Sequence, residues 1–196
     1  MLRMGKRMKF CSQCGTEVER LIPEGDNRQR HVCPECRTIH YQNPKMVVGC
    51  IPLWEEQVLL CRRAIEPRYG LWTLPAGFME NGETAQQGAA RETWEEAQAR
   101  VEMGELYTLF NLPHIDQVYL LFLSRLQSLD FGPGSESLEV ALFDESEIPW
   151  DELAFPVVKE TLKLFFADRS TDSLRLRSGS ILRVSEHPRR YRTEVF

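Results

Sequence analysis

Four cysteines stand in two closely spaced pairs near the start of the chain. Cys11 and Cys14 are separated by two residues, as are Cys33 and Cys36, and 18 residues lie between the pairs. Two thiolates at this spacing on a tight turn can face one tetrahedral Zn²⁺ ion, and a second such turn completes the site. Four sulfur ligands favour zinc over harder cations and leave no coordination position for a substrate water. The spacing therefore predicts a structural zinc ribbon.

The ribbon is too small to bury much apolar surface, so we expect metal binding to supply much of its folding free energy. The alternative interpretation of the same spacing is two redox-active cysteine pairs. The remaining cysteines, Cys50 and Cys61, lie within apolar, strand-like runs and are expected to be small core residues.

Three glutamates on one predicted helix can bind a harder cation. At about 100° per residue, Glu92, Glu95 and Glu96 fall within about a quarter turn of one helix face. Their charges repel one another unless cations neutralise them, and carboxylate oxygens suit Mg²⁺ or Mn²⁺. Arg91 borders this face and can orient one carboxylate. Because a glutamate-rich helix is more often a solvated surface, the surrounding sequence has to decide between the two interpretations.

The glutamates lie on a helix predicted over Thr84–Ala97. Thr84 and Gln87 stand three residues apart at its start, which is the spacing of a capping box. Four residues on the opposite face are expected to pack against a sheet: Ala90, Thr93, Trp94 and Ala97.

Extended segments surround this helix and complete a predicted α/β domain. Strands are expected over 46–53, 58–61, 71–76, 106–112, 118–123 and 139–143, with a hairpin loop at 54–57 and a second helix over 157–166. We therefore divide the chain into a zinc ribbon over 1–42, an α/β domain over 43–167 and a basic tail over 168–196. The tail is expected to be either disordered or an amphipathic hairpin.

Composition excludes several classes of protein. The 196 residues are 42% hydrophobic, which excludes a wholly disordered chain, and no apolar run approaches the ~20 residues needed to cross a membrane. Residues 1–10 are basic without a following apolar run, so we expect a cytoplasmic protein without a secretory signal or a membrane partner. Residues 43–167 hold 9 Lys and Arg against 20 Asp and Glu, a net charge of −11 that disfavours nucleic-acid binding.

The segment from Gly77 to Ala99 resembles the Nudix box, G-x5-E-x7-R-E-U-x-E-E-x-G-U, in which U is apolar. All of the charged positions match: Glu83, Arg91, Glu92, Glu95 and Glu96. Two positions depart from the pattern. Thr93 is less apolar than usual, and Gln98 replaces a glycine that normally allows a left-handed residue at the helix end. Either Gln98 adopts that conformation at a cost of about 1 kcal/mol, or the helix continues to Arg100.

This resemblance implies a Nudix hydrolase, an α/β/α sandwich with a mixed sheet that cuts a nucleoside diphosphate linked to another moiety. Clustered divalent ions suit that reaction because they neutralise the diphosphate, activate a water and stabilise the leaving phosphate. By resemblance, Glu92, Glu95 and Glu96 are the Mg²⁺ (or Mn²⁺) ligands, with the Gly77 carbonyl nearby. Glu83 and Arg91 resemble an ion pair that holds the loop against the helix. Glu139 matches a place where the family often carries another acidic group.

A zinc ribbon before the Nudix domain narrows the resemblance to two subfamilies. The NADH pyrophosphatases carry a Ser-Gln-Pro-Trp-Pro-Phe-Pro array after the box, and this chain lacks it. The other group is similar to the plant chloroplast FAD and ADP-ribose diphosphatase, which segments 41–50, 70–78 and 133–139 resemble closely. We therefore expect hydrolysis of FAD or ADP-ribose with release of AMP, and an NADH pyrophosphatase is the alternative.

Two other classes of function stay open. A ligand-sensing Nudix domain without catalysis tends to lose box carboxylates, and this box keeps them. A nucleic-acid-binding ribbon is the other class, although a stacking platform and a large positive patch are not evident and no nucleic-acid partner is expected. The basic residues that favour it form a modest cluster: Arg28, Arg30, His31 and Arg37.

Substrate-binding residues are harder to recognise. Arg62, Arg63 and Arg68 precede the box and can bind phosphates, because arginine gives bidentate contacts. The candidates for stacking on the adenine or flavin ring are Phe78, Tyr69, Phe110 and His114. Many proteins of the family are dimers, so the tail over 168–196 is alternatively expected to pack on a second subunit.

Overall fold

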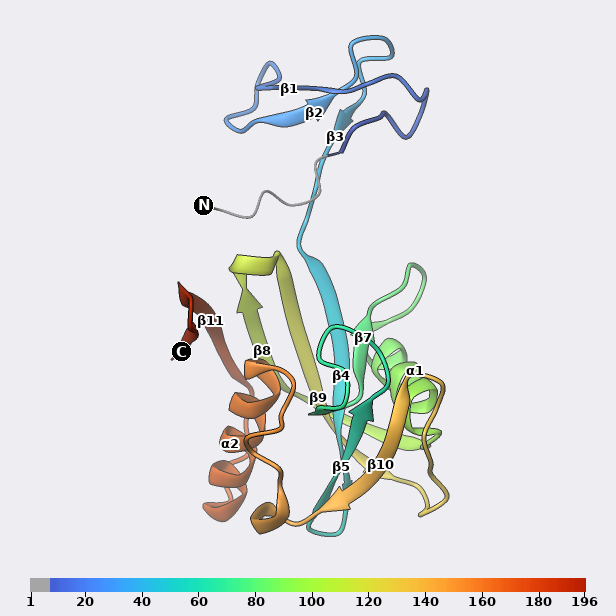
Figure 1. The fold of residues 1–196 in the computed structure, drawn as a ribbon, viewed down its shortest axis with the longest axis vertical. Coiled ribbons are helices and arrows are strands. Elements are labelled where there is room, and N and C mark those ends of the chain that lie inside the picture. The colour runs from blue at the N-terminus through green and yellow to red at the C-terminus, as the bar shows by residue number, and fades with distance from the viewer. Residues whose placement is uncertain (1–7) are drawn as a thin grey trace. The chain divides into compact units, whose positions relative to one another are not determined.

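The computed structural model describes residues 8–196, so the first seven residues of the predicted ribbon segment lie outside the described part of the chain. The chain divides into two compact units, with the boundary between Pro44 and Lys45 (Figure 1).

The first unit is a small antiparallel sheet with little apolar content. Its strands are β1 (Glu19–Leu21), β2 (Arg30–Val32) and β3 (Ile39–His40), in that order across the sheet. Its buried hydrophobic cluster consists of Cys11, Val18 and Cys33. A cluster of this size cannot offset the entropy of ordering the chain, so the fold of this unit depends on its cysteine site.

The second unit is built on one mixed sheet of nine strands. Along the sheet the strands follow the order β10-β5-β4-β9-β8-β11-β12, with β6 on β5 and β7 on β4. The β4–β9 and β8–β11 pairs are parallel, and the other pairs are antiparallel. The strands have the following bounds: β4 Lys45–Trp54, β5 Gln57–Arg63, β6 Trp72–Thr73, β7 Ala76–Phe78, β8 Val101–Leu112, β9 Gln117–Leu126, β10 Ser137–Phe143, β11 Arg177–Glu186 and β12 Arg189–Val195.

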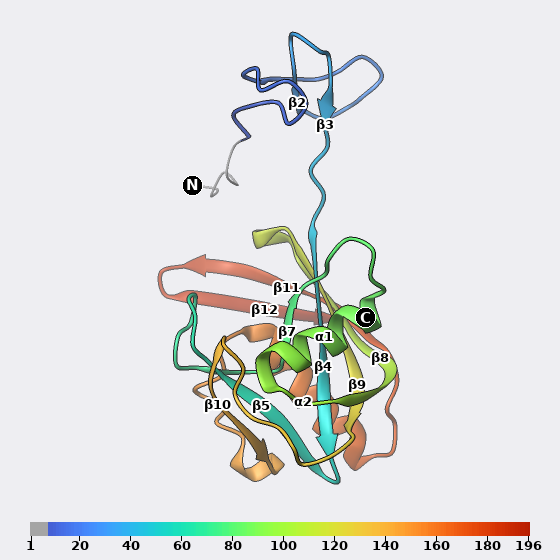
Figure 2. The same cartoon turned by 90° about the vertical axis from the view of Figure 1, so that its right-hand side faces the viewer.

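Two α-helices cover the two faces of this sheet. In Figure 2, α1 (Ala85–Ala97) lies in front of the strands and α2 (Pro156–Ser170) lies behind them. Alternation along β4 serves both layers, because Val48 and Cys50 pack with α1 while Ile51 joins the larger core under α2. This arrangement confirms the predicted α/β sandwich with a mixed sheet. Two short 3₁₀ helices, η1 (Pro113–Ile115) and η2 (Glu145–Glu147), complete the elements.

The helix that carries the glutamates begins as predicted. The Thr84 side chain accepts from the Gln87 backbone N–H at 3.2 Å, and the Gln87 side chain accepts from the Thr84 N–H at 2.8 Å. The helix ends at Ala97, and Gln98 takes the left-handed conformation with φ 49°. Of the two alternatives for Gln98, the chain therefore adopts the strained one.

Other predicted segments need correction. Trp94 does not pack on the sheet: it is 48% exposed, and the guanidinium of Arg100 lies 5.1 Å from its ring centroid. The buried residues of α1 are mostly small: Gly88, Ala89, Thr93, Glu96 and Ala97. The extended segment over 71–76 divides into the separate short strands β6 and β7. No helix among residues 8–196 is long and apolar enough to cross a bilayer.

The tail forms the hairpin β11–β12 and extends the sheet. Residues Arg177–Ser180 pair in parallel with β8, and Ile181 is fully buried in the larger core. Asp168, buried near the end of α2, accepts a hydrogen bond from the Tyr107 hydroxyl at 2.9 Å and from Arg177 Nε at 2.8 Å. Arg177 Nη2 also bonds the second Asp168 oxygen. This charged triad fastens the tail to the second unit.

Candidate functional site

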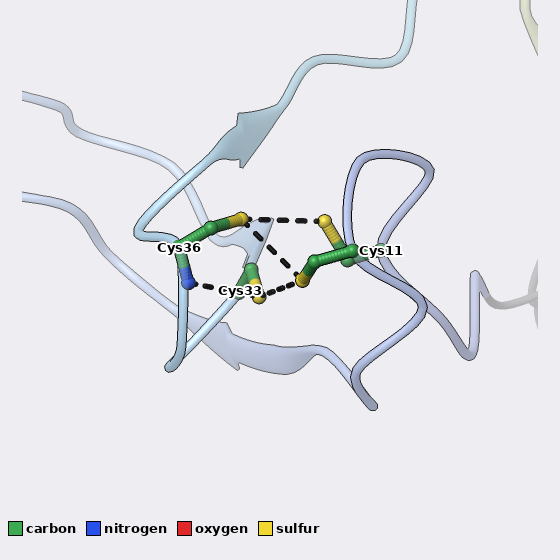
Figure 3. Close-up of side chains that lie close together, drawn as sticks. Cys11, Cys33 and Cys36 are labelled. Carbon is green, nitrogen blue, oxygen red and sulfur yellow. Dashed lines mark hydrogen bonds between the residues drawn. The ribbon is translucent and has the colours of Figure 1, made fainter.

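The four cysteines of the ribbon converge on one point. The Sγ–Sγ distances are 3.6 Å for Cys11–Cys36, 3.4 Å for Cys14–Cys33 and 3.6 Å for Cys14–Cys36. Figure 3 shows Cys11, Cys33 and Cys36 with their sulfur atoms turned toward one another. A tetrahedral ZnS₄ site with Zn–S bonds of ~2.3 Å needs sulfur atoms about 3.8 Å apart. The cysteines therefore fit Zn²⁺ with four protein ligands, which is a structural site.

The cysteines differ in their surroundings: hydrogen bonding from Thr16 lowers the pKa of Cys14, whereas burial and the neighbouring thiols raise the pKa of Cys33 to about 11. The backbone N–H of Gln13 donates to Cys11 Sγ at 3.3 Å, and that of Cys36 donates to Cys33 Sγ at 3.4 Å. Hydrogen bonding by the Thr38 side chain and backbone lowers the pKa of Cys36 to about 6. His40 Nε2 lies 3.3 Å from Cys11 Sγ, so the histidine can orient this ligand from outside the sulfur cluster.

Arg91 is the centre of the charged cluster in the Nudix-like segment. Its Nε and Nη2 donate to the two oxygens of Glu83 at 3.1 and 2.9 Å. Its Nη1 donates to Glu92 at 2.8 Å and to Glu95 at 2.9 Å, while Nη2 also reaches the Phe78 carbonyl at 3.1 Å. One guanidinium thus joins the loop after β7 to the glutamate face of α1.

The carboxylates on α1 differ in their surroundings. The Arg91 guanidinium lowers the pKa of Glu83. Burial raises the pKa of Glu92, against the opposing effect of Arg91. Glu96 is only 5% exposed, and burial raises its pKa to about 8 although the Ala76 N–H donates to it at 3.2 Å. A cation would relieve the cost of burying this charge.

The glutamates are not arranged as tightly as the cysteines. Within residues 8–196, only the four cysteines place three or more candidate ligand atoms within 4.8 Å of one another. Glu92 and Glu95 instead share the charge of Arg91. Gly77 lies directly against this cluster, since a Cβ atom built on it would overlap the Glu92 carboxylate. The donor set of three carboxylates and a neighbouring backbone fits Mg²⁺ or Mn²⁺.

Glu136, in the turn that leads into β10, also acts on this cluster. Its charge acts on both Glu92 and Glu96 and raises the pKa of each. Glu139, the residue selected from the sequence, instead forms an ion pair of 3.5 Å with Arg62 on the adjacent strand β5. The sequence analysis missed Glu136, although it lies in the same 133–139 segment, three residues before Glu139.

The predicted substrate-binding residues lie in different environments. Arg63 is buried, donates to the Pro67 carbonyl at 3.0 Å and lowers the pKa of Glu96 through its charge. Arg62 donates to the Gly70 carbonyl at 3.0 Å, and Arg68 is exposed in the loop that follows β5. The Phe78 ring is 48% exposed, and Lys45 Nζ lies 4.6 Å from its centroid. The sequence analysis did not select Lys45, which places a positive charge beside the Phe78 ring.

Family models match both units of the chain. A model described as the Nudix N-terminal zinc ribbon matches residues 9–42, and the NUDIX domain model matches residues 43–165. Among solved structures, a NUDIX hydrolase from Nitrosomonas europaea is 61% identical with a TM-score of 0.87, covering 89% of this chain and 99% of that one. An ADP-ribose pyrophosphatase from Streptococcus suis, 23% identical with a TM-score of 0.54 over 69% of this chain and 99% of that one, shares the fold.

Curated relatives carry a more specific name. The NAD-capped RNA hydrolase NudC of Photobacterium profundum is 27% identical over 172 residues, which is 84% of this chain and 62% of that protein. NudC of Vibrio vulnificus is 37% identical over 100 residues, which is 47% of this chain and 34% of that protein. The chain thus spans about three fifths or less of the length of these relatives.

Proposed function

This chain belongs to the Nudix family, and we propose that it is a metal-dependent pyrophosphohydrolase that cleaves an adenosine diphosphate derivative and releases AMP. The observation that carries the proposal is the position of Arg91, which binds Glu83 in the loop and two glutamates of α1 at once. A substrate-binding loop held in this way against a carboxylate face suits a reaction that needs fixed metal ligands.

The roles of the charged residues follow from their surroundings. Nudix enzymes use Mg²⁺ or Mn²⁺, and such ions neutralise the diphosphate and activate a water when bound. We assign their ligation to Glu92, Glu95 and Glu96 with the Gly77 carbonyl, and the charge of Glu136 adds to theirs. Arg91 and Glu83 position the ligands. Glu139 is proposed to act through Arg62, because the two form an ion pair rather than facing the cluster.

The two halves of the substrate need different contacts. Phosphate oxygens suit the arginines before the box, Arg62, Arg63 and Arg68, and Arg63 is the one whose charge reaches Glu96. An aromatic base suits the exposed ring of Phe78, beside which Lys45 supplies a further positive charge. Arg62 and Arg63 lie on β5 and Phe78 on β7, and both strands pair with β4. We place the reacting diphosphate at the glutamate face of α1.

Two substrate types compete within this class. The names of the curated relatives favour NAD(H), free or as the cap of an RNA, which was the alternative in the sequence analysis. The absence of the Ser-Gln-Pro-Trp-Pro-Phe-Pro array and the matches over 41–50, 70–78 and 133–139 favour FAD or ADP-ribose. All four compounds share an ADP half, so recognition of that half is the common proposal.

A hydrolysis panel with Mg²⁺ tests the proposal. FAD, ADP-ribose, NADH and NAD-capped RNA are compared with coenzyme A, diadenosine polyphosphates and 8-oxo-dGTP. The readout is chromatographic separation of both products of each cleavage: AMP with its partner for FAD, ADP-ribose and NADH, and NMN with a 5′-monophosphate RNA for the capped RNA. We expect one of the first four to give the highest kcat/KM. Preference for a nucleoside triphosphate, or the absence of hydrolysis of every compound, would contradict it. Preference for NAD-capped RNA over NADH would also replace the expectation that no nucleic acid is bound.

The proposed location is the cytoplasm. Six cysteines are free thiols in the structure, four of them gathered as metal ligands, and this state suits a reducing compartment. The proposed partners are the small nucleotide substrate and a second copy of the chain.

A further inference from the structure

A cleft lies at the C-terminal end of α1, on a side of the helix that the proposed hydrolase site does not use. It has a volume of about 250 Å³ and is lined by six residues: Trp94, Gln98, Arg100, Ser128, Asp130 and Phe131. At 3.6 residues per turn, Trp94 points roughly 160° away from Glu92 and from Glu96 around the helix axis. The cleft therefore opens on a different face of α1 from the glutamates.

The loop between β9 and β10 forms one wall of this cleft and is bonded to the end of the helix. The Gln127 N–H donates to the Arg100 carbonyl and the Gly132 N–H donates to the Ala97 carbonyl, both at 2.9 Å. Phe131 packs on the buried cluster that includes Ala97. The two walls of the cleft are therefore held together by backbone hydrogen bonds and by apolar packing.

Two residues of the cleft depart from what their positions in the sequence favour. Gln98 takes the left-handed conformation, with φ 49° and ψ 23°, at a position where the Nudix pattern has glycine. Trp94 stays half-exposed, although helical spacing predicts a packed residue there. Strained residues and breaches of a local rule gather at functional sites. Because both residues line the same cleft, they point to a ligand that this cleft binds.

The charges of the cleft select a flat, neutral ligand. The Arg100 guanidinium lies 5.1 Å from the Trp94 ring centroid, so the indole face already holds a cation, and Arg100 would repel a second one. The exposed carboxylate of Asp130 and the negative end of the α1 dipole repel a phosphate group. A nucleobase suits this environment, because it stacks on an aromatic ring and on a guanidinium plane alike.

We propose that this cleft binds the guanine base of a nucleoside, either free or within a single-stranded RNA, with the base stacked on Trp94. The Asp130 carboxylate offers two acceptor oxygens, and guanine is the RNA base that presents two adjacent N–H donors, at N1 and N2. The O6 acceptor of the base suits the Gln98 amide, and Arg100, displaced from the indole, covers the other face of the base. Adenine has no such pair of donors and should bind more weakly.

A titration of the full chain, with zinc bound and without Mg²⁺, tests this site. The NMR signals of the Trp94 indole N–H and the Gln98 side-chain amide should shift on saturation with guanosine, with a Kd below about 1 mM. GMP should bind no more tightly than guanosine, because the site repels phosphate. Inosine, which lacks the amino group at C2, and adenosine should each bind about fivefold more weakly or less tightly still. Excess AMP, a product of the proposed hydrolase site, should not displace guanosine.

Substitutions separate the contacts of the base. Trp94→Leu should weaken guanosine binding about tenfold or more, because the stacking surface is lost. Tyr41→Leu, at an exposed aromatic residue of the ribbon, is the matched control and should leave binding unchanged. Gln98→Gly should weaken binding while it raises Tm, the combination expected of a strained binding residue.

Asp130→Asn provides a readout that a structural role would not change. Xanthosine carries a carbonyl at C2 where guanosine carries an amino group, and an asparagine amide offers one donor and one acceptor group. The variant should therefore reverse the preference from guanosine to xanthosine. An unchanged preference for guanosine would show that Asp130 does not contact the base.

An oligouridylate that carries one guanosine distinguishes the two sources of the base. Binding tighter than that of guanosine assigns the site to RNA, and equal or weaker binding assigns it to free nucleosides. Guanosine that shifts neither signal, or that binds equally well to the Trp94→Leu variant, would overturn the proposal. Saturation by acetylarginine amide in place of guanosine would also overturn it, because the cleft would then bind a cation. Hydrolysis is measured in none of these arms, so the hydrolysis panel succeeds or fails separately.

Discussion

The carboxylate of Glu92 occupies the space that a side chain at Gly77 would need. Gly77 belongs to β7 and Glu92 to α1, so the absence of a side chain on the strand sets how closely the helix carboxylate approaches the backbone. The first position of the Nudix box is thereby coupled to a proposed metal ligand through packing alone.

Substituting Gly77 should therefore affect catalysis. Gly77→Ala would displace the Glu92 carboxylate, and we expect kcat at saturating Mg²⁺ to fall about 10²-fold, the usual cost of losing one electrostatic contact to the transition state. Gly132→Ala is the matched control, because a Cβ there meets no atom within 4 Å. Equal activity of the two variants would show that the Glu92 position is not needed.

Glu96→Gln tests the buried carboxylate of the cluster. The substitution keeps the volume and removes a hard anionic ligand, so kcat should fall by 10²-fold or more, equivalent to about 2.7 kcal/mol. The melting temperature without Mg²⁺ should not fall, because a buried charge and its repulsion from Glu92 are removed. Glu80→Gln, at an exposed variable position of the same loop, should change kcat far less. The reverse ranking of the two variants would disprove the assigned ligands.

Zinc and magnesium should have separable effects. We expect one zinc per chain, and its removal should unfold the ribbon without abolishing hydrolysis, because its four positions are filled by sulfur. Magnesium should be needed for turnover alone. The measurements are metal content, the amide NMR signals of residues 8–44 and AMP release. Loss of hydrolysis with an intact ribbon would show that the cysteine site is catalytic.

Gln98→Gly should stabilise the protein. Gln98 holds a left-handed conformation that glycine adopts without strain. We expect the relief of this strain to outweigh the entropic cost of fixing glycine, which is more flexible than glutamine in the unfolded chain. We expect an increase of about 0.5–1 kcal/mol in the free energy of unfolding, or about 1–4 °C in Tm. Gln98→Ala should give no such gain. A lower Tm for the glycine variant would mean that the Gln98 side chain makes a stabilising contact.

The Asp168–Arg177 pair predicts a dependence of stability on pH. Hydrogen bonding from Arg177 lowers the pKa of Asp168. The contribution of the pair to stability is therefore complete above about pH 4, the ordinary pKa of aspartate, and is lost as the pH falls through the lowered pKa. Denaturant titrations should show Asp168→Asn less stable than the original chain at pH 7, with the difference shrinking toward pH 2. A constant difference would exclude this ionisation as the cause.

The sequence was sufficient where local spacing decides structure. Thr84 and Gln87 define the helix start through bonds between neighbours, and paired cysteines define the ribbon. Packing decided the features that were missed. Trp94 lies outside the buried residues of α1 and is 48% exposed, although helical spacing placed it on the packed face. The charge of Glu136 acts on the glutamates from a segment distant in sequence.

The contacts of the tail could not be predicted from local sequence either. Alternation over 173–184 allowed a hairpin, but no local pattern indicates that Ile181 is buried or that β11 pairs with β8. Contacts between β8 and β11 join residues about 70 positions apart, so their entropic cost is recovered only when the whole sheet forms.

The hairpin β11–β12 is an integral part of the second unit and cannot be removed without exposing its core. The family model ends at residue 165, yet Asp168, Arg177 and Ile181 complete the layer around Tyr107 and Phe110. Deletion at that boundary would leave aromatic side chains in water and convert β8 from an interior strand into an edge. A shortened chain is therefore expected to fold only if the core face behind the hairpin is redesigned together with the new sheet edge.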